Sequence, residues 1–436
     1  MNAQVQTIGV VPGDIARSGN GVTFANTLLA IAVFLGGFVI FEPAPYELML
    51  AAMLAVWFLF GLKFYRATLP LIICIFGFAT GGVLSTSQMA DLEGGLIYVT
   101  VTFFLGMTSI FFASVIADDM GRLRLIFRAY LVAAVITATL GIIGYFDALP
   151  GFSLFTRYDR AMGAFEDPNV FGPFIVAPIL YLIYGLLTRS LSLAPLRLIM
   201  LSILLLGVFL AFSRAAWGLA IISIFFMYTI LFLNEQNAKQ RLKYVMLAIF
   251  GVAFVIVLLV IALQFDQVAS LFSERAKTVQ SYDGDRLGRF ARHTIGFGWA
   301  VEMPLGLGPL EFGKIFGEET HNIWLKTLMG YSWLGFLSYL TLVLWTLIGG
   351  FKLLFRPRPW QPYFIISYSA FLGHIIVGWV IDIDHWRHLY MLIGVMWGCF
   401  VLERRWQRYC AQRIFVKSEF GAKQMPAPKS NSITAA

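Results

Sequence analysis

The sequence predicts an all-α polytopic membrane protein with about twelve transmembrane helices and one large loop outside the cytoplasm. Hydrophobic residues make up 59% of the 436 residues and charged residues only 13%, whereas soluble domains carry roughly 45–50% apolar and about 25% charged residues. So little charge cannot cover a water-facing surface of this size. The composition therefore excludes a soluble globular enzyme, a disordered chain and a nucleic-acid-binding protein.

Apolar runs long enough to span a membrane recur along the chain. Crossing about 30 Å of hydrocarbon takes about 20 apolar residues in a helix. No evident cleavage site precedes the first run, which indicates an anchor rather than a signal peptide. Only Ser213 and Arg214 separate the seventh run from the eighth. The predicted spans are 22–41, 45–62, 68–87, 95–117, 125–147, 169–188, 197–212, 215–233, 244–265, 321–349, 361–381 and 388–403.

Lys and Arg set the predicted orientation. With the N-terminus in the cytoplasm, 21 of the 32 Lys and Arg residues fall in cytoplasmic segments, as the positive-inside rule requires. This places both termini in the cytoplasm. The predicted organisation is an N-terminal tail at 1–21, a transmembrane domain at 22–403 with an outer loop at 266–320, and a basic tail at 404–436 that we expect to lie on anionic lipid.

The eleven basic residues left on the outer side concentrate in the loops 148–168 and 266–320, and eight of them are arginine. The planar arginine fork binds phosphate through two parallel hydrogen bonds, so this cluster predicts an anionic ligand. The alternative is a set of salt bridges with the loop acids Asp159, Glu166, Asp283, Asp285 and Glu311. The eleven are Arg157, Arg160, Arg214, Arg275, Lys277, Arg286, Arg289, Arg292, Lys314, Lys326 and Arg387.

Two of the predicted helix starts carry polar residues that suit a site. Asp167 precedes Pro168 and Asn169 at the start of the sixth span, and it is expected to be the N-cap because Pro is favoured as the first helical residue. A well-capped helix is the alternative to a functional role. Arg214 lies at the hydrocarbon edge, where arginine is costly and usually faces protein or a water-filled cavity. It is predicted to bind phosphate, or alternatively to anchor the helix at the interface.

His321 is the candidate general base. Residues 285–303 read as an amphipathic helix that places Arg286 beside Phe290 and His293. A Gly- and Pro-rich turn follows, and then Glu318 and Glu319 lead to His321 at the predicted mouth of the tenth span. An imidazole there can take a proton near neutral pH. The alternative is an ordinary polar residue at a helix end.

A further polar cluster precedes the last span. Asp384, His385 and His388 have a spacing that could hold a metal ion, with Asp382 and Arg387 beside them. No further well-spaced ligand lies nearby. Packing, or the wall of a pocket, is therefore the preferred interpretation, and we predict no metal site.

Taken together, these residues resemble the bacterial O-antigen ligase and O-antigen (exopolysaccharide) polymerase superfamily. Four features match in order: the G-x-F-x-D-P-N stretch at 163–169, Ser213-Arg214, Gly288-Arg289 followed by the turn at 304–309, and Thr320-His321-Asn322. The resemblance runs from about 158 to about 348, and the number of spans extends it to both ends. The superfamily has a Trp soon after the second arginine, whereas this chain has His293 and Thr294.

The resemblance implies a GT-C-like glycosyltransferase in a bacterial inner membrane. Its donor would be a glycan on polyprenyl (undecaprenyl) diphosphate, its acceptor a growing glycan or lipid A core, and its site would face the periplasm without a metal or nucleotide cofactor. It implies that His321 activates the acceptor hydroxyl and that Arg214 and Arg289 bind the diphosphate. The additional substrate-binding candidates are Arg286, Arg292, Asp167, Asn169, Asn322 and Arg160.

Two questions stay open at the level of sequence. Ligase and polymerase use the same donor and differ only in the acceptor, and the chain has no separate acceptor domain by which to tell them apart. A transporter or flippase for lipid-linked oligosaccharides would also have about twelve spans with both termini inside. A transporter is expected to carry ionisable residues near the membrane midplane, whereas here they gather at the outer edge. Glycan transfer is therefore favoured over transport.

Overall fold

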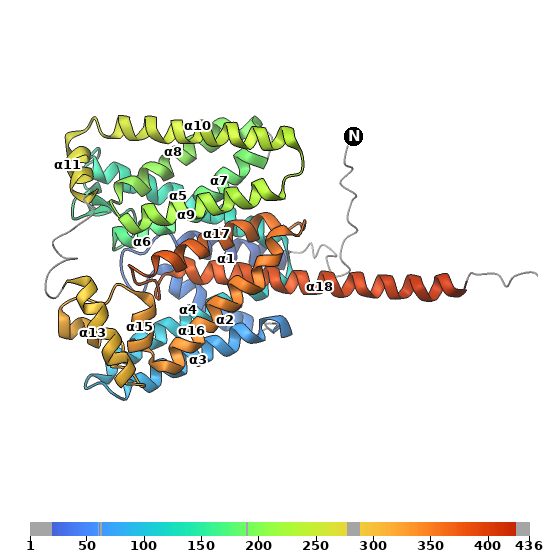
Figure 1. Cartoon of the computed structure of the whole chain (residues 1–436), viewed down its shortest axis with the longest axis horizontal. Helices are drawn as coiled ribbons and strands as arrows, with labels where there is room; N and C mark the ends of the chain where they lie inside the picture. Colours follow the sequence, from blue (N-terminus) through green and yellow to red (C-terminus); the bar gives the residue numbers. More distant parts are fainter. Residues whose placement is uncertain (1–19, 60, 62, 189–190, 277–287, 424–436) are drawn as a thin grey trace, which may run out of the picture.

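The helices of the computed structural model lie side by side with their long axes roughly in one direction (Figure 1). The structure describes residues 20–59, 61, 63–188, 191–276 and 288–423, and for Asn20, Leu191, Arg289, Phe290 and 413–423 it describes the backbone only. The α-helices are α1 (Asn20–Leu35), α2 (Pro45–Leu59), α3 (Leu69–Thr86), α4 (Leu92–Asp118), α5 (Gly121–Tyr145), α6 (Pro168–Phe174), α7 (Val176–Thr188), α8 (Ala194–Leu210), α9 (Arg214–Asn234), α10 (Ala238–Ala262), α11 (Asp266–Arg275), α13 (Arg289–Glu302), α14 (Glu311–Phe316), α15 (Ile323–Gly330), α16 (Ser332–Phe351), α17 (Gln361–Val377) and α18 (Arg387–Lys423).

The helices confirm an all-α membrane protein, although they do not confirm twelve spans. Among the described residues, seven helical segments are long and apolar enough to cross a bilayer. Four further apolar helices are shorter, from 15 to 17 residues. The seven are Arg66–Thr86, Leu92–Asp118, Gly121–Tyr145, Pro168–Thr188, Arg214–Asn234, Ala238–Ala262 and Ser332–Phe355, and the four are Gly21–Leu35, Pro45–Leu59, Ala194–Leu210 and Gln361–Val377.

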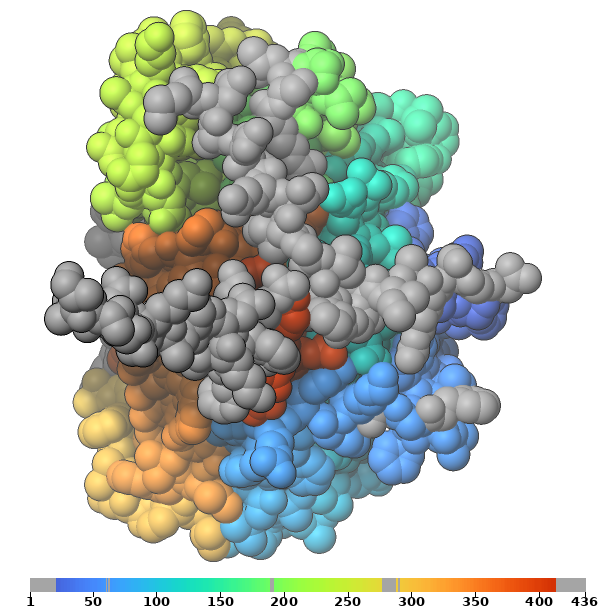
Figure 2. All heavy atoms as spheres, turned by 90° about the vertical axis from the view of Figure 1, so that its right-hand side faces the viewer, coloured from blue at the N-terminus to red at the C-terminus, as the bar shows by residue number. Residues whose placement is uncertain are grey.

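The bundle has a packed centre and an apolar outside. In α4, 72% of the apolar stretch is buried, whereas in α10 only 6% is. Large side chains of α10 such as Phe250 and Val252 are more than 60% exposed. Viewed along the bundle, the yellow-green α10 lies at its rim (Figure 2). Exposed apolar surface of this extent is expected of a helix that faces lipid.

The connecting segments separate into two ends, as the predicted alternation of loops requires. At one end, Val39 contacts Phe165, Lys314 pairs with Asp91, and Phe146 packs on Phe265. At the other end, Tyr65 bonds Asp118, Arg356 and Arg358 pair with Glu403, and Asn234 bonds the carbonyl of Leu354. We call the first the site end; it holds α13, α14 and α15 and lies to the left in Figure 1.

The predicted tenth span, 321–349, is wrong at its beginning. The chain forms the short helix α15, breaks after Gly330, and starts the membrane-length helix α16 at Ser332, whose φ of +60° lies in the left-handed region. The apolar pattern of 321–349 concealed this break. A continuous helix would have carried Lys326 into the hydrocarbon, where a cation is costly. Instead, α15 packs beside α13 in a small core of its own, formed by Ala300, Phe312, Leu325, Leu328 and Met329.

The predicted sixth span is also interrupted, at Ile175 between α6 and α7. Pro178 has no N–H, so the carbonyl of Phe174 has no helical donor at that position. The hydroxyl of Tyr130 on α5 donates to this carbonyl instead. A neighbouring helix thereby satisfies the backbone group that proline leaves without a donor.

The last helix does not end at the predicted boundary of 403. α18 continues to Lys423 as one helix of 37 residues, and Figure 1 shows it extending past the other helices at the end opposite the site. Glu403, which is only 3% exposed, marks the place where it leaves the bundle, through its ion pairs with Arg356 and Arg358. The expectation that the tail 404–436 lies on anionic lipid stays a prediction, and residues 424–436 of this tail lie outside the described residues.

Candidate functional site

The first group of polar residues at the site end surrounds the start of α6. Asp167 is the N-cap of α6, with Pro168 in the first helical turn, and its carboxylate accepts a hydrogen bond of 2.7 Å from the N–H of Asn169. The predicted cap is thus confirmed. The two-residue strands β1 (Thr156–Arg157) and β2 (Arg160–Ala161) form an antiparallel hairpin beside it. The turn residues Tyr158 and Asp159 have φ of +55° and +54°, as this tight hairpin turn requires.

Arg160 holds this group together. It is 6% exposed, and it donates from Nε to the carbonyl of Ala211 (2.7 Å) and from Nη2 to Asn169 Oδ1 (2.8 Å). These bonds join the hairpin, α6 and the end of α8. Arg160 and Asn169 therefore stabilise the packing of these elements. Substrate binding by these two residues stays a prediction that their contacts do not support.

Arg214 begins α9, next to that group. Ser213 is the N-cap and accepts from the N–H of Ala216 at 3.4 Å. One turn further along α9, a Cβ placed on Gly218 would lie 3.9 Å from Val377 Cγ1 at the end of α17. The carbonyl of the next residue, Gly378, accepts a 2.8 Å bond from the N–H of Ile323 in α15. The end of α17 therefore links the start of α9 to the start of α15, where His321 lies.

His321 lies between two carboxylates just before α15. Its Nε2 is 2.9 Å from Glu318 Oε1, and its Nδ1 is 3.8 Å from Asp382 Oδ2. The side chain is 31% exposed, and the backbone has φ of +48°, which is unusual for a residue other than glycine. Asn322 follows as the N-cap of α15, accepting from the N–H groups of Trp324 and Leu325. At this turn the imidazole lies between Glu318 and Asp382, with part of its side chain exposed to solvent.

α13 supplies the arginine next to His321. Arg292 Nη2 lies 2.6 Å from Glu318 Oε2, and the Arg292 side chain is only 8% exposed. His293 Nε2 bonds the carbonyl of Thr320 at 2.6 Å, which ties α13 to the same turn. α13 begins at Arg289, later than the predicted helix 285–303. Arg286 and the side chain of Arg289 lie outside the described residues, so their predicted roles are untested.

Lys326 forms the centre of a second, deeper part of this group. Its ammonium lies 3.4 Å from Asp384 Oδ1 and 3.7 Å from Asp382 Oδ2, and it is only 10% exposed. Asp384, 2% exposed, also accepts a 2.7 Å bond from the hydroxyl of Tyr98 on α4. Since Asp382 also faces His321, one chain of charged groups runs from Arg292 through His321 to Lys326.

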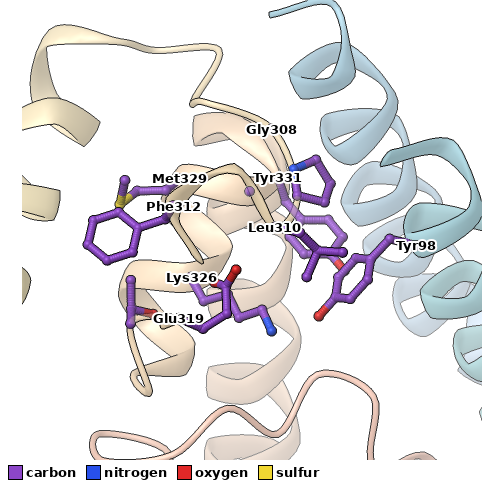
Figure 3. Close-up of a pocket in the computed structure, with 11 residues that line it drawn as sticks. Tyr98, Gly308, Leu310, Phe312, Glu319, Lys326, Met329 and Tyr331 are labelled. Carbon is purple, nitrogen blue, oxygen red and sulfur yellow. The ribbon is translucent and has the colours of Figure 1, made fainter. Parts of the chain in front are cut away.

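A pocket opens beside this chain of charges, beneath the turn at 304–309. The empty space between its lining atoms, including space open to solvent, amounts to about 260 Å³. Figure 3 shows the ammonium of Lys326 and the hydroxyl of Tyr98 turned toward the same space, with Leu310 and Tyr331 beside them. Leu310 has φ of +65°, so the covering loop turns back sharply. The residues that line the pocket include Tyr98, Phe312, Glu319, Lys326 and Tyr331.

Burial and neighbouring charges set the protonation of the group. Burial would raise the pKa of Glu318, but hydrogen bonds from Arg292 and His321 outweigh it and hold that pKa below its usual range. For Glu319, burial prevails over the attraction of Lys326, and its pKa is raised. Burial would lower the pKa of Lys326, but Asp382, Asp384 and Glu319 raise it further than burial lowers it. Glu318 and Lys326 are therefore charged at neutral pH.

The residues considered as metal ligands before the last span separate in the structure. Asp384 turns to Lys326, whereas His385 stacks on Tyr98 at 3.9 Å and bonds Thr102 at 2.7 Å. His388 is buried and lies 3.1 Å from His374, measured between their Nε2 atoms. Within the part of the chain that the structure describes, no three His, Cys, Asp or Glu side chains are grouped so that they could hold a metal ion.

Some of the outer cations form the loop salt bridges considered as the alternative. Lys314 pairs with Glu311 at 2.8 Å, and Arg157 lies 4.0 Å from Glu166. Arg387 pairs with Glu42 at 2.7 Å and also contacts Glu47. These pairs account for cations on the rim. They do not account for Arg292, whose carboxylate partner also contacts His321.

Sequence reasoning missed three features of this group. Glu318 is identified from the sequence only as a neighbour of His321, and Asn322 is not predicted to cap a helix. Lys326 is counted only among the outer cations, with no structural or functional role assigned to it. The Asn322 cap had a signal, because an Asn directly before an apolar helix is a preferred N-cap. The sequence contains no local pattern that predicts the cluster around Lys326, since the carboxylates that pair with Lys326 lie more than fifty residues away in the sequence.

Comparison of the sequence with protein-family models gives no match, and comparison with curated proteins gives none either.

Acid is expected to destabilise the segment 378–386 by protonating His385. Burial lowers the pKa of His385 to about 4, whereas an exposed histidine titrates near 6.5. A depressed pKa means that His385 contributes stability above about pH 6.5, and that this contribution is lost as the pH falls toward 4. We expect a loss of about 2 kcal/mol by pH 5, seen as a fall in Tm of the detergent-purified protein. The variant His385→Gln should lose less between pH 7.5 and 5; an equal fall in both proteins would contradict the assignment.

Proposed function

We propose that this chain is a membrane glycosyltransferase that moves a glycan from a polyprenyl diphosphate carrier to an acceptor hydroxyl. The observation that supports this best is the position of His321, a partly exposed imidazole at the edge of the bundle with Glu318 and Asp382 on its two nitrogens and Arg292 one contact away. A base next to a guanidinium, at the boundary between membrane and water, suits a substrate with a lipid tail, an anionic linker and a sugar.

The proposed chemistry needs one base and one or more cations. The acceptor hydroxyl must lose its proton as it attacks the sugar carbon, and His321 would take that proton. A positioned general base contributes typically 10²–10⁴-fold in rate. The bond from sugar to diphosphate breaks with negative charge growing on the phosphate, and guanidinium groups placed in advance stabilise that charge. The leaving group is already activated, so the step requires neither a metal nor a nucleotide.

Three arginines are the proposed diphosphate ligands. Arg292 reaches the turn that carries His321, Arg289 starts the same helix, and Arg214 starts α9. The start of α9 lies next to the end of α17 at Val377, and Gly378 accepts a hydrogen bond from Ile323 at the start of α15, which supports a role for Arg214 at this site. Arginines from two separate elements can then grip one diphosphate from two sides. In this proposal the site end faces the periplasm of a bacterial inner membrane, and both termini are cytoplasmic.

The acceptor decides between polymerase and ligase. Purified protein would be incubated with a polyprenyl-diphosphate glycan, together with either further glycan repeats or lipid A core. A ladder of longer glycans without lipid A would identify an O-antigen or exopolysaccharide polymerase, and a mass shift of lipid A core would identify an O-antigen ligase. Absence of any new glycosidic product with both acceptors would contradict the proposal.

A transporter or flippase for lipid-linked oligosaccharides is the competing function. The strongly buried charged groups described above, Arg160, Arg292, Lys326, Asp384 and Glu403, lie near the two ends of the bundle. Transport sites are expected at the bilayer midplane, so this distribution favours a reaction at the membrane surface. The incubation above also separates the two functions, since a transporter makes no new bond in detergent.

Arg214→Lys should already impair transfer. Lysine keeps the positive charge but cannot make the two parallel hydrogen bonds that arginine makes to a phosphate. We expect the rate of glycan transfer by the purified variant to fall by roughly 10- to 100-fold, with expression and Tm close to those of the wild type. Full activity would mean that Arg214 anchors the helix at the interface and does not touch the donor.

A further inference from the structure

We propose that Arg292 forms an anion site for a diphosphate group and that Glu318 occupies this site in the absence of the ligand, blocking His321 at the same time. The identity of the ligand rests on the proposed function. The contacts of Glu318 described below do not depend on it. In this view Glu318 is a built-in competitor of the diphosphate, displaced by it before the reaction begins.

The two oxygens of Glu318 serve two different partners. Oε2 accepts from Arg292 Nη2 at 2.6 Å, and Oε1 contacts His321 Nε2 at 2.9 Å. A carboxylate held by a guanidinium on one side and an imidazole on the other resembles, in charge and in acceptor geometry, a phosphate bound to the same pair. Because Arg292 and the Glu318 carboxylate are both charged, the contact is of the stronger, charge-assisted kind.

The two partners differ in their freedom to move. Arg292 is 8% exposed and lies on α13, whereas Glu318 is 44% exposed on the turn before α15. Glu318 can therefore swing into water, where its charge is solvated, whereas the buried guanidinium of Arg292 would then be left unpaired unless another anion takes the place of Glu318. Among the described residues, the buried Nε of Arg292 has no hydrogen-bond partner, so Glu318 leaves part of the guanidinium unused.

Displacement of Glu318 would also release the base. A carboxylate only accepts hydrogen bonds, so His321 Nε2 carries its proton while it contacts Glu318, and a nitrogen that carries a proton cannot take another. When Glu318 leaves, Nε2 loses its acceptor. The ring can then release this proton to water while Nδ1, which faces Asp382 at 3.8 Å, takes one up, so that the neutral ring holds its single proton on Nδ1 and Nε2 is free to accept. Binding of the donor would thereby prepare the base, and His321 would stay blocked when no donor is bound.

The test compares anion binding by the whole chain and by its variants in nanodiscs of phosphatidylcholine, which has no net charge. Inorganic pyrophosphate is titrated and followed by calorimetry. We expect Glu318→Gln, which keeps the shape but removes the charge of the competitor, to bind pyrophosphate on the order of tenfold more tightly than the wild type. Glu318→Ala should behave similarly, and Arg292→Gln should lose the binding.

Glu311→Gln is the matched control, because it removes one carboxylate from the same segment, where Glu311 pairs with Lys314 and not with Arg292. It should bind like the wild type. Farnesyl diphosphate should show the same dependence on Glu318 as pyrophosphate does. Equal pyrophosphate affinity in the wild type, Glu318→Gln and Glu318→Ala would overturn the proposal.

Two further results separate the possible sources of the anion and the two proposals. If adding phosphatidylglycerol to the nanodiscs abolished the tighter binding of pyrophosphate by Glu318→Gln, the site would belong to phospholipid headgroups. The assignment to diphosphate would then be overturned. Binding needs no transfer reaction. If the protein transfers no glycan but the Glu318 variants still bind pyrophosphate more tightly, only the proposed glycosyltransferase activity is contradicted. If the protein transfers glycan but the Glu318 variants bind pyrophosphate like the wild type, only the proposal that Glu318 competes with the diphosphate is contradicted.

Discussion

His321→Ala is expected to abolish glycan transfer while the protein still inserts and folds. The imidazole is the proposed acceptor of the hydroxyl proton, and a positioned base contributes about 10²–10⁴-fold in rate. The side chain is 31% exposed and contacts Glu318 and Asp382 rather than the apolar core, so little packing is lost. The measurement is the rate of glycan transfer by purified protein, with Tm and yield from the membrane fraction recorded alongside.

His321→Asn is the control for the backbone at this position. His321 has φ of +48°, and Asn tolerates this left-handed region well but cannot act as a base near neutral pH. If both variants are inactive and folded, the loss comes from the missing imidazole and not from a shifted turn. Normal polymer or ligated product from either variant would end the hypothesis that His321 is the base.

Lys326→Met should destabilise the site end by about 3–5 kcal/mol, because it leaves buried carboxylates without their cation. Asp384 is 2% exposed and Asp382 14% exposed, and both lie within 4 Å of the Lys326 ammonium. The double variant Lys326→Met with Asp384→Asn should recover part of this loss, since it also removes one of the stranded charges. Tm and the denaturant midpoint of detergent-purified protein measure both effects.

Lys314→Met is the matched control for that experiment. Lys314 also contacts two carboxylates, those of Asp91 at 3.3 Å and Glu311 at 2.8 Å, but it is 49% exposed. Exposed pairs contribute about 0–1 kcal/mol, so this variant should stay close to the wild type. An equally small effect at Lys326 would mean that water reaches Asp382 and Asp384 and that the cluster is not a rigid support for His321.

Local signals in the sequence predicted much of the fold correctly. The apolar runs predicted the helices of the bundle, whereas the orientation predicted from Lys and Arg stays a prediction. The pair Asp167-Pro168 predicted a capped helix start, which the structure confirms. Each of these depends on residues within one or two turns of one another, and such short-range preferences are visible in the amino-acid order.

The errors came where an apolar pattern continued across a break. The run 321–349 reads as one span, although α15 and α16 are separate helices joined at a left-handed Ser332. Hydropathy cannot show this break, because α15 is apolar for a different reason, namely that it packs on Phe312 and Ala300 in the small core of the site end. Likewise, α18 continues to Lys423 because no residue that ends a helix occurs where the charged residues begin.

By itself, the sequence determined that this chain is a helical membrane protein and where most of its apolar helices lie. Hydrophobic content and charge placement act residue by residue, so they can be read without coordinates. Only the tertiary structure decided that Glu318 joins Arg292 to His321 and that Asp382 joins His321 to Lys326. Contacts of a few ångströms between α13, α15 and the segment 378–386 depend on how separate helices pack, and no local preference specifies them.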